Sequence, residues 1–228
     1  MEQKNIETLT LKEIKNRLEG QVAATDMPMM EPGFTMLYGG KRQFGKAAVP
    51  HCPYRLPGIR IGLFIKGEAQ ITLNLIPRHL SGNTLTFFCD GAILQIDGIS
   101  NDSDVRGVLV EPWLMNELFP QGVPAMFNGQ VKDALMPVDD STFAKIQHLY
   151  EALALVLRDK PVSRSAALSI ISALCCVYSE YYVRVSAHPA EAPSRQRMLF
   201  DAFIALVNQH AKSEHNLAFY ADKLCLSQ

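Results

Sequence analysis

The sequence predicts an α+β protein, in which an antiparallel β-barrel or sandwich comes first and an all-helical half follows. Short runs of alternating apolar and polar residues, separated by Gly, Asn and Asp, fill residues 59–110 and are typical of strands in such a fold. From residue 139 onward, apolar residues recur every three or four positions, which is the period of an amphipathic helix. These two patterns place the strands ahead of the helices.

The first segment, residues 1–30, is expected to form an arm. Thr10 can cap a short helix whose apolar positions are Leu11, Ile14 and Leu18, and Gly20 can end it. Between residues 27 and 57, prolines and glycines stand among scattered aromatic residues, which favours short strands and turns over helix. The arm therefore leads into a β-rich body.

The body, residues 31–140, carries the clearest strand signals. Apolar and polar residues alternate over residues 59–66 and again over 71–76, and Gly67 between them allows a turn. This spacing predicts an antiparallel hairpin with one apolar face. Three further strands are expected at residues 84–88, 92–96 and 105–110.

Two long helices are predicted after the body. The run that begins at Asp139 is a helix start, and Ser163 can cap a second helix that extends to about Val185. This second helix carries two apolar stripes, so it needs two buried contacts. One stripe can be the interface of a dimer built from residues 141–190; alternatively, the chain's own helices cover both stripes. The residues assigned to the dimer interface are Ala167, Ile170, Leu174, Tyr178 and Tyr181.

The tail, residues 195–228, predicts two more helices. Leu199, Phe203 and Val207 share one helical face, and Asn216 can cap a second, shorter helix after a polar break. That short helix is expected to end in a tight turn just before Ser227.

The order of these tail features resembles the first helix-turn-helix of the AraC family of bacterial transcription regulators. The matching residues are Asn216-Leu217 opening the short helix, Tyr220-Ala221 as its packing pair and Leu224 to Ser227 as the turn. The resemblance implies that residues 195–228 begin a truncated DNA-binding domain, and that its base-reading helix would follow Ser227, outside this chain. A plain C-terminal helical hairpin is the alternative.

A looser resemblance covers the strands. Gly67, the run Asn83-Thr84-Leu85, Phe87-Phe88 and Gly91 look like the cupin-type sensor barrel that precedes the DNA-binding half in the AraC family. The resemblance implies an effector-sensing barrel. Many such sensors carry a His just after the Gly that follows the hydrophobic strand, whereas Leu94 and its neighbours are apolar here, so no role for that His is carried over.

Candidate effector-binding residues follow from the polar and aromatic side of residues 59–66. Arginine offers several fixed donors in one plane, which suits hydroxyl-rich or carboxylate ligands. For each residue, an ordinary solvated strand face is the alternative. The candidates are Arg60 and Phe64 on this strand, Tyr54 and Arg55 ahead of it, and Asn74 and Arg106, which are expected to share its side of the sheet.

Composition limits the other roles of the chain. A net charge of -1 and a pI near 6.6 give no general attraction for polyanions, so DNA is expected as a partner only of a longer protein. The first residues lack a secretory leader pattern, and the longest apolar run, residues 166–178, is short for a membrane span, so a cytoplasmic protein is expected. The five cysteines form no C-x-x-C pair.

An enzyme is not expected from the motifs. The six histidines, at positions 51, 79, 148, 188, 210 and 215, include no pair one residue apart of the kind that a catalytic cupin uses to hold its metal. No G-x-S-x-G or Gly-rich phosphate loop occurs either, so no metal or cofactor is expected. Two alternatives to a sensor remain: a metal-dependent enzyme of cupin fold, and a protein-interaction module that binds no small molecule.

Overall fold

The computed structural model describes residues 6–22, 27–39, 43, 46–187, 195–210 and 213–226. The chain divides into two compact units, Met1–Val185 and Ser186–Gln228. The expected linker at residues 188–193 and the expected cap at Ser227 lie outside the described residues.

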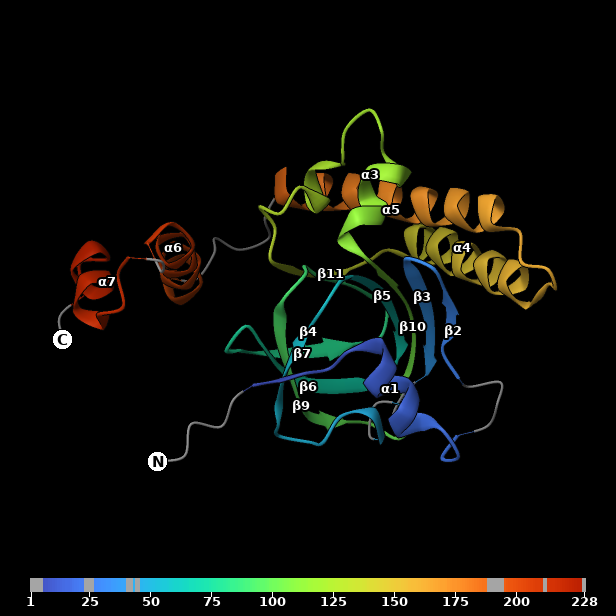
Figure 1. Ribbon diagram of the computed structural model, residues 1–228, viewed down its shortest axis with the longest axis horizontal. Coiled ribbons are helices and arrows are strands. Elements are labelled where there is room, and N and C mark those ends of the chain that lie inside the picture. The colour runs from blue at the N-terminus through green and yellow to red at the C-terminus, as the bar shows by residue number, and fades with distance from the viewer. Residues whose placement is uncertain are drawn as a thin grey trace. The chain divides into compact units, whose positions relative to one another are not determined.

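The first unit is built around two β-sheets, one of six strands in the order β11-β8-β5-β10-β3-β2 and one of five in the order β1-β4-β9-β6-β7 (Figure 1). Neighbouring strands run antiparallel, except that β1 pairs with β4 in parallel. Strands precede the long helices, so the predicted α+β class is confirmed. The strands are β1 (Glu7–Thr8), β2 (Met29–Glu31), β3 (Phe34–Gly39), β4 (Pro53–Leu56), β5 (Ile59–Lys66), β6 (Glu68–Leu73), β7 (Ile76–Ser81), β8 (Thr84–Phe88), β9 (Ala92–Ile99), β10 (Asp104–Val110) and β11 (Asp133–Pro137).

The hairpin predicted around Gly67 is wrong. Strand β5 pairs with β8 and β10, whereas β6 pairs with β7 and β9, so the chain passes from one sheet to the other at this glycine. Gly67 has a φ of 86°, and a Cβ there would lie 2.5 Å from Ser100 Oγ and 2.7 Å from Ser103 Cα. The glycine is therefore required for a close crossing between the sheets and not for a two-residue hairpin loop.

The strand predicted at residues 71–76 also ends earlier than expected. Asn74 and Leu75 have φ values of 47° and 67°, and together they form the two-residue turn between β6 and β7. Two consecutive positive φ values are typical of the tight hairpin turn. Leu75 is left 67% exposed at its tip, although its apolar character suggested a strand interior.

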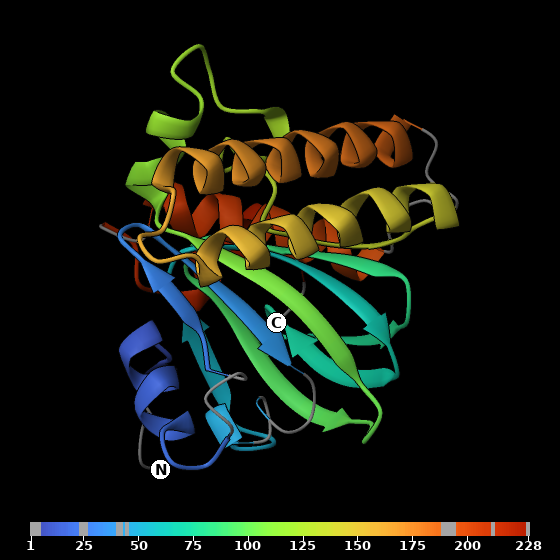
Figure 2. The same cartoon turned by 90° about the vertical axis from the view of Figure 1, so that its right-hand side faces the viewer.

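Helices α4 (Asp140–Arg158) and α5 (Arg164–Ala187) cover the outer face of the six-stranded sheet (Figure 2). The predicted start of α4 is confirmed, because the Asp139 carboxylate caps it by accepting from the backbone N–H of Thr142 at 2.8 Å. The shorter helices are α1 (Leu11–Leu18), α3 (Pro112–Leu118) and the 3₁₀ turn η2 (Ala125–Phe127).

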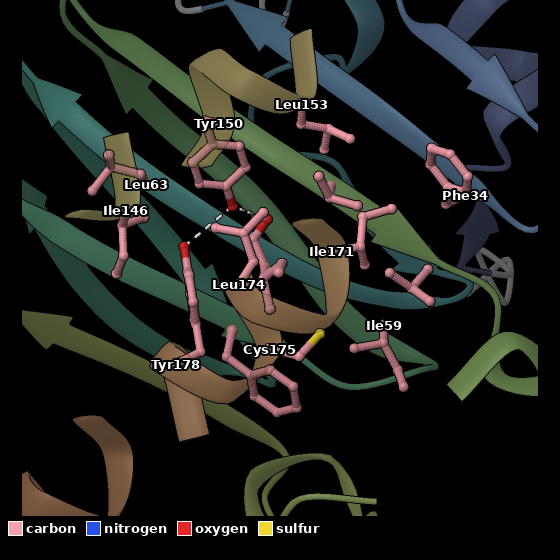
Figure 3. Packing of buried hydrophobic residues seen from close by; sticks show 14 of the residues in the cluster. Phe34, Ile59, Leu63, Ile146, Tyr150, Leu153, Ile171, Leu174, Cys175 and Tyr178 are labelled. Carbon is pink, nitrogen blue, oxygen red and sulfur yellow. Dashed lines mark hydrogen bonds between the residues drawn. The ribbon is translucent and has the colours of Figure 1, made fainter. Parts of the chain in front are cut away.

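The core between sheet and helices contains a buried pair of tyrosines (Figure 3). The Tyr150 hydroxyl donates to the carbonyl of Ile61 at 3.1 Å and lies 3.2 Å from the Tyr178 hydroxyl. Because Tyr150 has one proton and gives it to Ile61, Tyr178 must be the donor to Tyr150. This chain of hydrogen bonds joins α5 and α4 to the backbone of β5.

The apolar stripe assigned to the dimer interface lies mostly in this core. Ala167, Leu174 and Tyr178 are fully buried within the chain, Tyr181 is 8% exposed, and Ile170 is partly buried against the same cluster. Side chains already covered by their own sheet cannot form a contact with a second subunit. This assignment is corrected, because helical periodicity shows that a stripe must be buried but not which surface buries it.

By length and composition alone, α5 is also apolar enough to cross a membrane, with a mean hydropathy of 1.4 over an 18-residue window. Its inward side instead forms part of the hydrophobic core with the six-stranded sheet. Core helices of folded domains commonly have this composition.

The second unit contains α6 (Arg195–His210) and α7 (Leu217–Lys223). Asn216 caps α7, as predicted, by accepting from the backbone N–H of Ala218 at 3.0 Å. The rings of Phe203 and Tyr220 meet edge to face at 5.7 Å, and the Tyr220 hydroxyl donates to the Glu214 carbonyl at 2.7 Å. The tail therefore forms two packed helices and not a single rod.

Candidate functional site

A cavity of about 130 Å³ lies inside the first unit, between the inner faces of the two sheets. Strand β5 shows how it arises. Ile59, Ile61 and Leu63 point to the helices and belong to the main core, while Arg60, Gly62 and Phe64 alternate with them and point into the barrel. The side of this strand that looked solvent-facing in the sequence is thus the barrel interior.

The cavity is hollow because two glycines lie side by side in its wall. Gly62 on β5 pairs directly with Gly107 on β10, and the next residue in that row is Thr86 on β8. A Cβ on Gly62 would lie 2.6 Å from Thr86 Oγ1, whereas a Cβ on Gly107 would have a single neighbour, the Ile61 carbonyl oxygen at 3.4 Å. The space in front of Gly107 is therefore open to the cavity.

Apolar residues form most of the remaining wall. They come from both sheets, from α1 and from the segment before β4, and they include Phe88, the position paired with Arg60 on β8. The apolar lining consists of Leu9, Ile14, Leu18, Pro28, Leu37, Ala47, Ala48, Leu56, Ile61, Phe88, Leu94, Ile96, Val105 and Val108.

Arg60 is the one charged residue among the described residues that line this cavity. Its Nη2 donates to the Leu9 carbonyl at 3.3 Å, and its Nε is buried without a hydrogen-bond partner in the described part of the chain. Burial lowers the pKa of Arg60 to about 10, and the more distant carboxylates of Asp90 and Glu111 oppose that shift. The guanidinium is still a cation at neutral pH, and it is held in apolar surroundings.

The arm closes one side of the cavity. Thr10 caps α1, as predicted, through a reciprocal capping box with Glu13, and Ile14 and Leu18 on the buried side of α1 line the cavity. Arg17 on the same helix donates to the Tyr54 hydroxyl at 3.3 Å and forms an ion pair with Glu7. These contacts fix α1 against strand β4.

A second, smaller cavity of about 80 Å³ adjoins the first. Phe64, which was assigned to effector binding, lines this smaller space together with Ala69 and Ile71 of the five-stranded sheet. Five residues line both cavities and form the boundary between them: Thr86, Phe88, Leu94, Ile96 and Val105.

The structure brings three of the six candidate residues to the barrel interior: Tyr54 and Arg60 at the larger cavity and Phe64 at the smaller one. Arg55 is exposed, because it follows Tyr54 on β4 and so points outward.

The expectation that Asn74 and Arg106 share the side of Arg60 is wrong. Asn74 lies in the β6–β7 turn, where its side chain donates to Asp133 Oδ2 at 2.9 Å and accepts from the Ile93 N–H at 3.0 Å. Arg106 pairs with Leu63, whose side chain points to the helices, so it lies on the opposite face from Arg60. The strand register decides both placements.

Sequence reasoning missed the residues that shape the cavity, namely Gly62, Gly107, Thr86 and the buried Gln43. A glycine in the interior of each of two predicted strands was an available signal, because strand glycines often mark close approach or empty space. No group of three or more His, Cys, Asp or Glu side chains that could hold a metal occurs among the described residues.

No family model matches the sequence, and no curated protein matches it. The chain is similar to solved structures of ToxT from Vibrio cholerae: one matches 87% of this chain and 72% of that chain at 9% identity with a TM-score of 0.38. A ToxT structure described as unsaturated fatty acid bound covers 86% of this chain and 70% of that chain at 12% identity with a TM-score of 0.42. The AraC-like transcriptional activator CuxR covers 86% and 64%, at 8% identity and a TM-score of 0.37.

Proposed function

We propose that this chain is the effector-binding and dimerisation part of an AraC-type transcription regulator, with a small molecule held inside the barrel. The observation that carries the proposal is the apolar cavity between the sheets, in whose wall Arg60 is the one charged residue among the described residues. Ligand sites are typically apolar spaces with a few well-placed polar groups. A protein-interaction module with a filled barrel would have no need of such a space.

The tail supports the regulator part of the proposal. Helix α7 begins at the cap formed by Asn216, packs on α6 through Tyr220, and ends in a turn where Cys225 has a φ of 54°. A helix, a polar break, a short capped helix and a tight turn are the features on which the AraC resemblance rests. In this proposal the protein acts in the cytoplasm, and DNA is a partner of the complete regulator only.

A regulator needs two states that its effector distinguishes. The arm fits this role, since Leu9 ahead of α1 and Ile14 and Leu18 on α1 contribute to the wall of the cavity. Arg17 binds Tyr54 of β4 and forms an ion pair with Glu7, which fastens the arm. An occupant of the cavity would touch α1 directly. The arm would then be held more firmly when the effector is bound.

A thermal-shift panel tests the effector proposal. We expect at least one class among small organic acids, alcohols, aromatic metabolites and sugars to raise the melting temperature, because a ligand that binds only the folded state stabilises it. At a ligand concentration near 100 times Kd, the expected rise is about 5–10 °C. A panel in which no class raises the melting temperature would contradict the proposal.

The dimer is proposed through the outer side of α4 and α5. Leu155 on α4 and Val183 on α5 remain 63% and 53% exposed, in contrast to the buried stripe of α5. We expect the purified chain to sediment as a dimer at tens of micromolar. A monomer at that concentration would remove dimerisation from the proposed function and leave the ligand site unaffected.

A further inference from the structure

We propose that the effector is a small, mostly apolar monocarboxylate whose carboxylate binds the guanidinium of Arg60 inside the larger cavity. This inference rests on the proposed function, since it names the chemical class of the molecule that the barrel holds. Charge, unsatisfied polar atoms and the shape of the cavity each support it.

The charge of Arg60 has no close counter-charge. No ion pair within 4 Å involves Arg60 among the described residues, and the carboxylates of Asp90 and Glu111 act on it only from beyond that distance. A buried cation without a close counter-charge is costly, and a carboxylate that enters the cavity would reduce this cost. Planar guanidinium and carboxylate groups also match each other in two-point hydrogen bonding.

The hydrogen-bonding capacity near Arg60 is also unfilled. Two buried side-chain polar atoms lack a partner in the described part of the chain, Arg60 Nε and Thr35 Oγ1. Leu109 pairs with Thr35 on one side and with Arg60 on the other, so both atoms belong to the same inward-facing row of the sheet. Thr35 is not part of the cavity lining, so the unfilled capacity that faces the cavity is that of Arg60 Nε. Buried polar groups are nearly always satisfied in folded proteins, and an acceptor inside the cavity would satisfy this one.

The size and walls of the cavity limit the rest of the molecule. An apolar cavity of roughly 150 Å³ is enough to bind benzene, so a volume of about 130 Å³ admits a ring or a chain of about six carbons. Sugars are disfavoured, because the lining supplies few polar partners besides Arg60, Gln43, Thr86 and Tyr54. A second carboxylate would find no second cation in the described lining, so a single negative charge is expected.

A matched series of six-carbon ligands tests the inference by calorimetry on the full chain: hexanoate, hexanol and hexylamine. The unaltered chain should bind hexanoate about 10- to 100-fold more tightly than hexanol, which is the range expected for a buried hydrogen bond to a charged group. Hexylamine should not bind measurably, because its ammonium group would face Arg60. Equal affinities for hexanoate and hexanol would overturn the inference.

Two variants then place the effect at Arg60. Arg60→Met keeps a long apolar side chain and should lose the preference for hexanoate while it still binds hexanol, whereas Arg60→Lys should keep part of that preference. Hexanoate affinity that survives Arg60→Met would also overturn the inference. If hexanol or other neutral compounds bind as tightly as hexanoate, the monocarboxylate inference fails but the effector proposal stands. If no compound of the thermal-shift panel raises the melting temperature, both the inference and the proposed function fail.

Discussion

Gly107→Leu is expected to raise the stability of the chain and to abolish small-molecule binding. The Cβ at this position meets only the Ile61 carbonyl oxygen, at an acceptable 3.4 Å, and the rest of the side chain would extend into the cavity. Burying a leucine side chain contributes about 1.5–3 kcal/mol, and loss of a strand glycine adds about 0.5–1 kcal/mol. Strain from imperfect packing will reduce this gain, so we expect a net stabilisation of about 1–3 kcal/mol.

Two other glycines provide matched controls for this experiment. Gly62→Leu, at the position paired with Gly107, places its Cβ 2.6 Å from Thr86 Oγ1 and should destabilise the chain although it faces the same cavity. Gly98→Leu lies where an added Cβ has no neighbour within 4 Å, and it should leave ligand affinity unchanged. For all three variants, calorimetry measures the ligand affinity and thermal unfolding measures the stability. Ligand affinity that is intact in Gly107→Leu would show that the ligand binds elsewhere.

Tyr150→Phe is expected to cost about 1–3 kcal/mol of unfolding free energy, more than Tyr178→Phe. In the first variant the Tyr178 hydroxyl loses its acceptor in a fully buried site, which is the costly case. In the second variant Tyr150 still donates to the Ile61 carbonyl, so only one ordinary hydrogen bond is lost, at about 0.5–1.5 kcal/mol. Urea unfolding of the two single variants and of the double variant measures the difference and the coupling.

The pH dependence of this pair has a definite sign. Burial raises the pKa of Tyr150 and of Tyr178 above the ordinary tyrosine value of about 10. Above that pH the unfolded chain releases protons that the folded chain retains, so stability should fall as the pH rises beyond about 10. The difference in unfolding free energy between Tyr150→Phe and Tyr178→Phe should therefore be constant between about pH 6 and pH 9. Equal losses of unfolding free energy in the two variants, or a larger loss in Tyr178→Phe, would contradict the assignment of Tyr178 as the donor to Tyr150.

Local features of the chain could be predicted well. Thr10, Asp139 and Asn216 cap helices as expected, because capping depends on residues within one turn of the cap itself. Strand β5 was placed at its observed residues from its alternation alone. The candidate site was predicted only in part, since Arg60 and Tyr54 line the larger cavity and Asn74 and Arg106 do not.

The amino-acid sequence by itself determined the order of strands before helices, the residues of β5, the starts of several helices, and that apolar faces must be buried. Only the tertiary structure decided what each face is buried against. Alternation on β5 shows two faces, but the pairing with β8 and β10 turns Arg60 toward the cavity between the sheets. The stripe of α5 that was assigned to a dimer contact is instead buried in the core with α4 and the six-stranded sheet. The reason is physical: propensity and capping act over a few residues. The cavity instead depends on Gly62 and Gly107, which meet on neighbouring strands although they are 45 positions apart in the sequence.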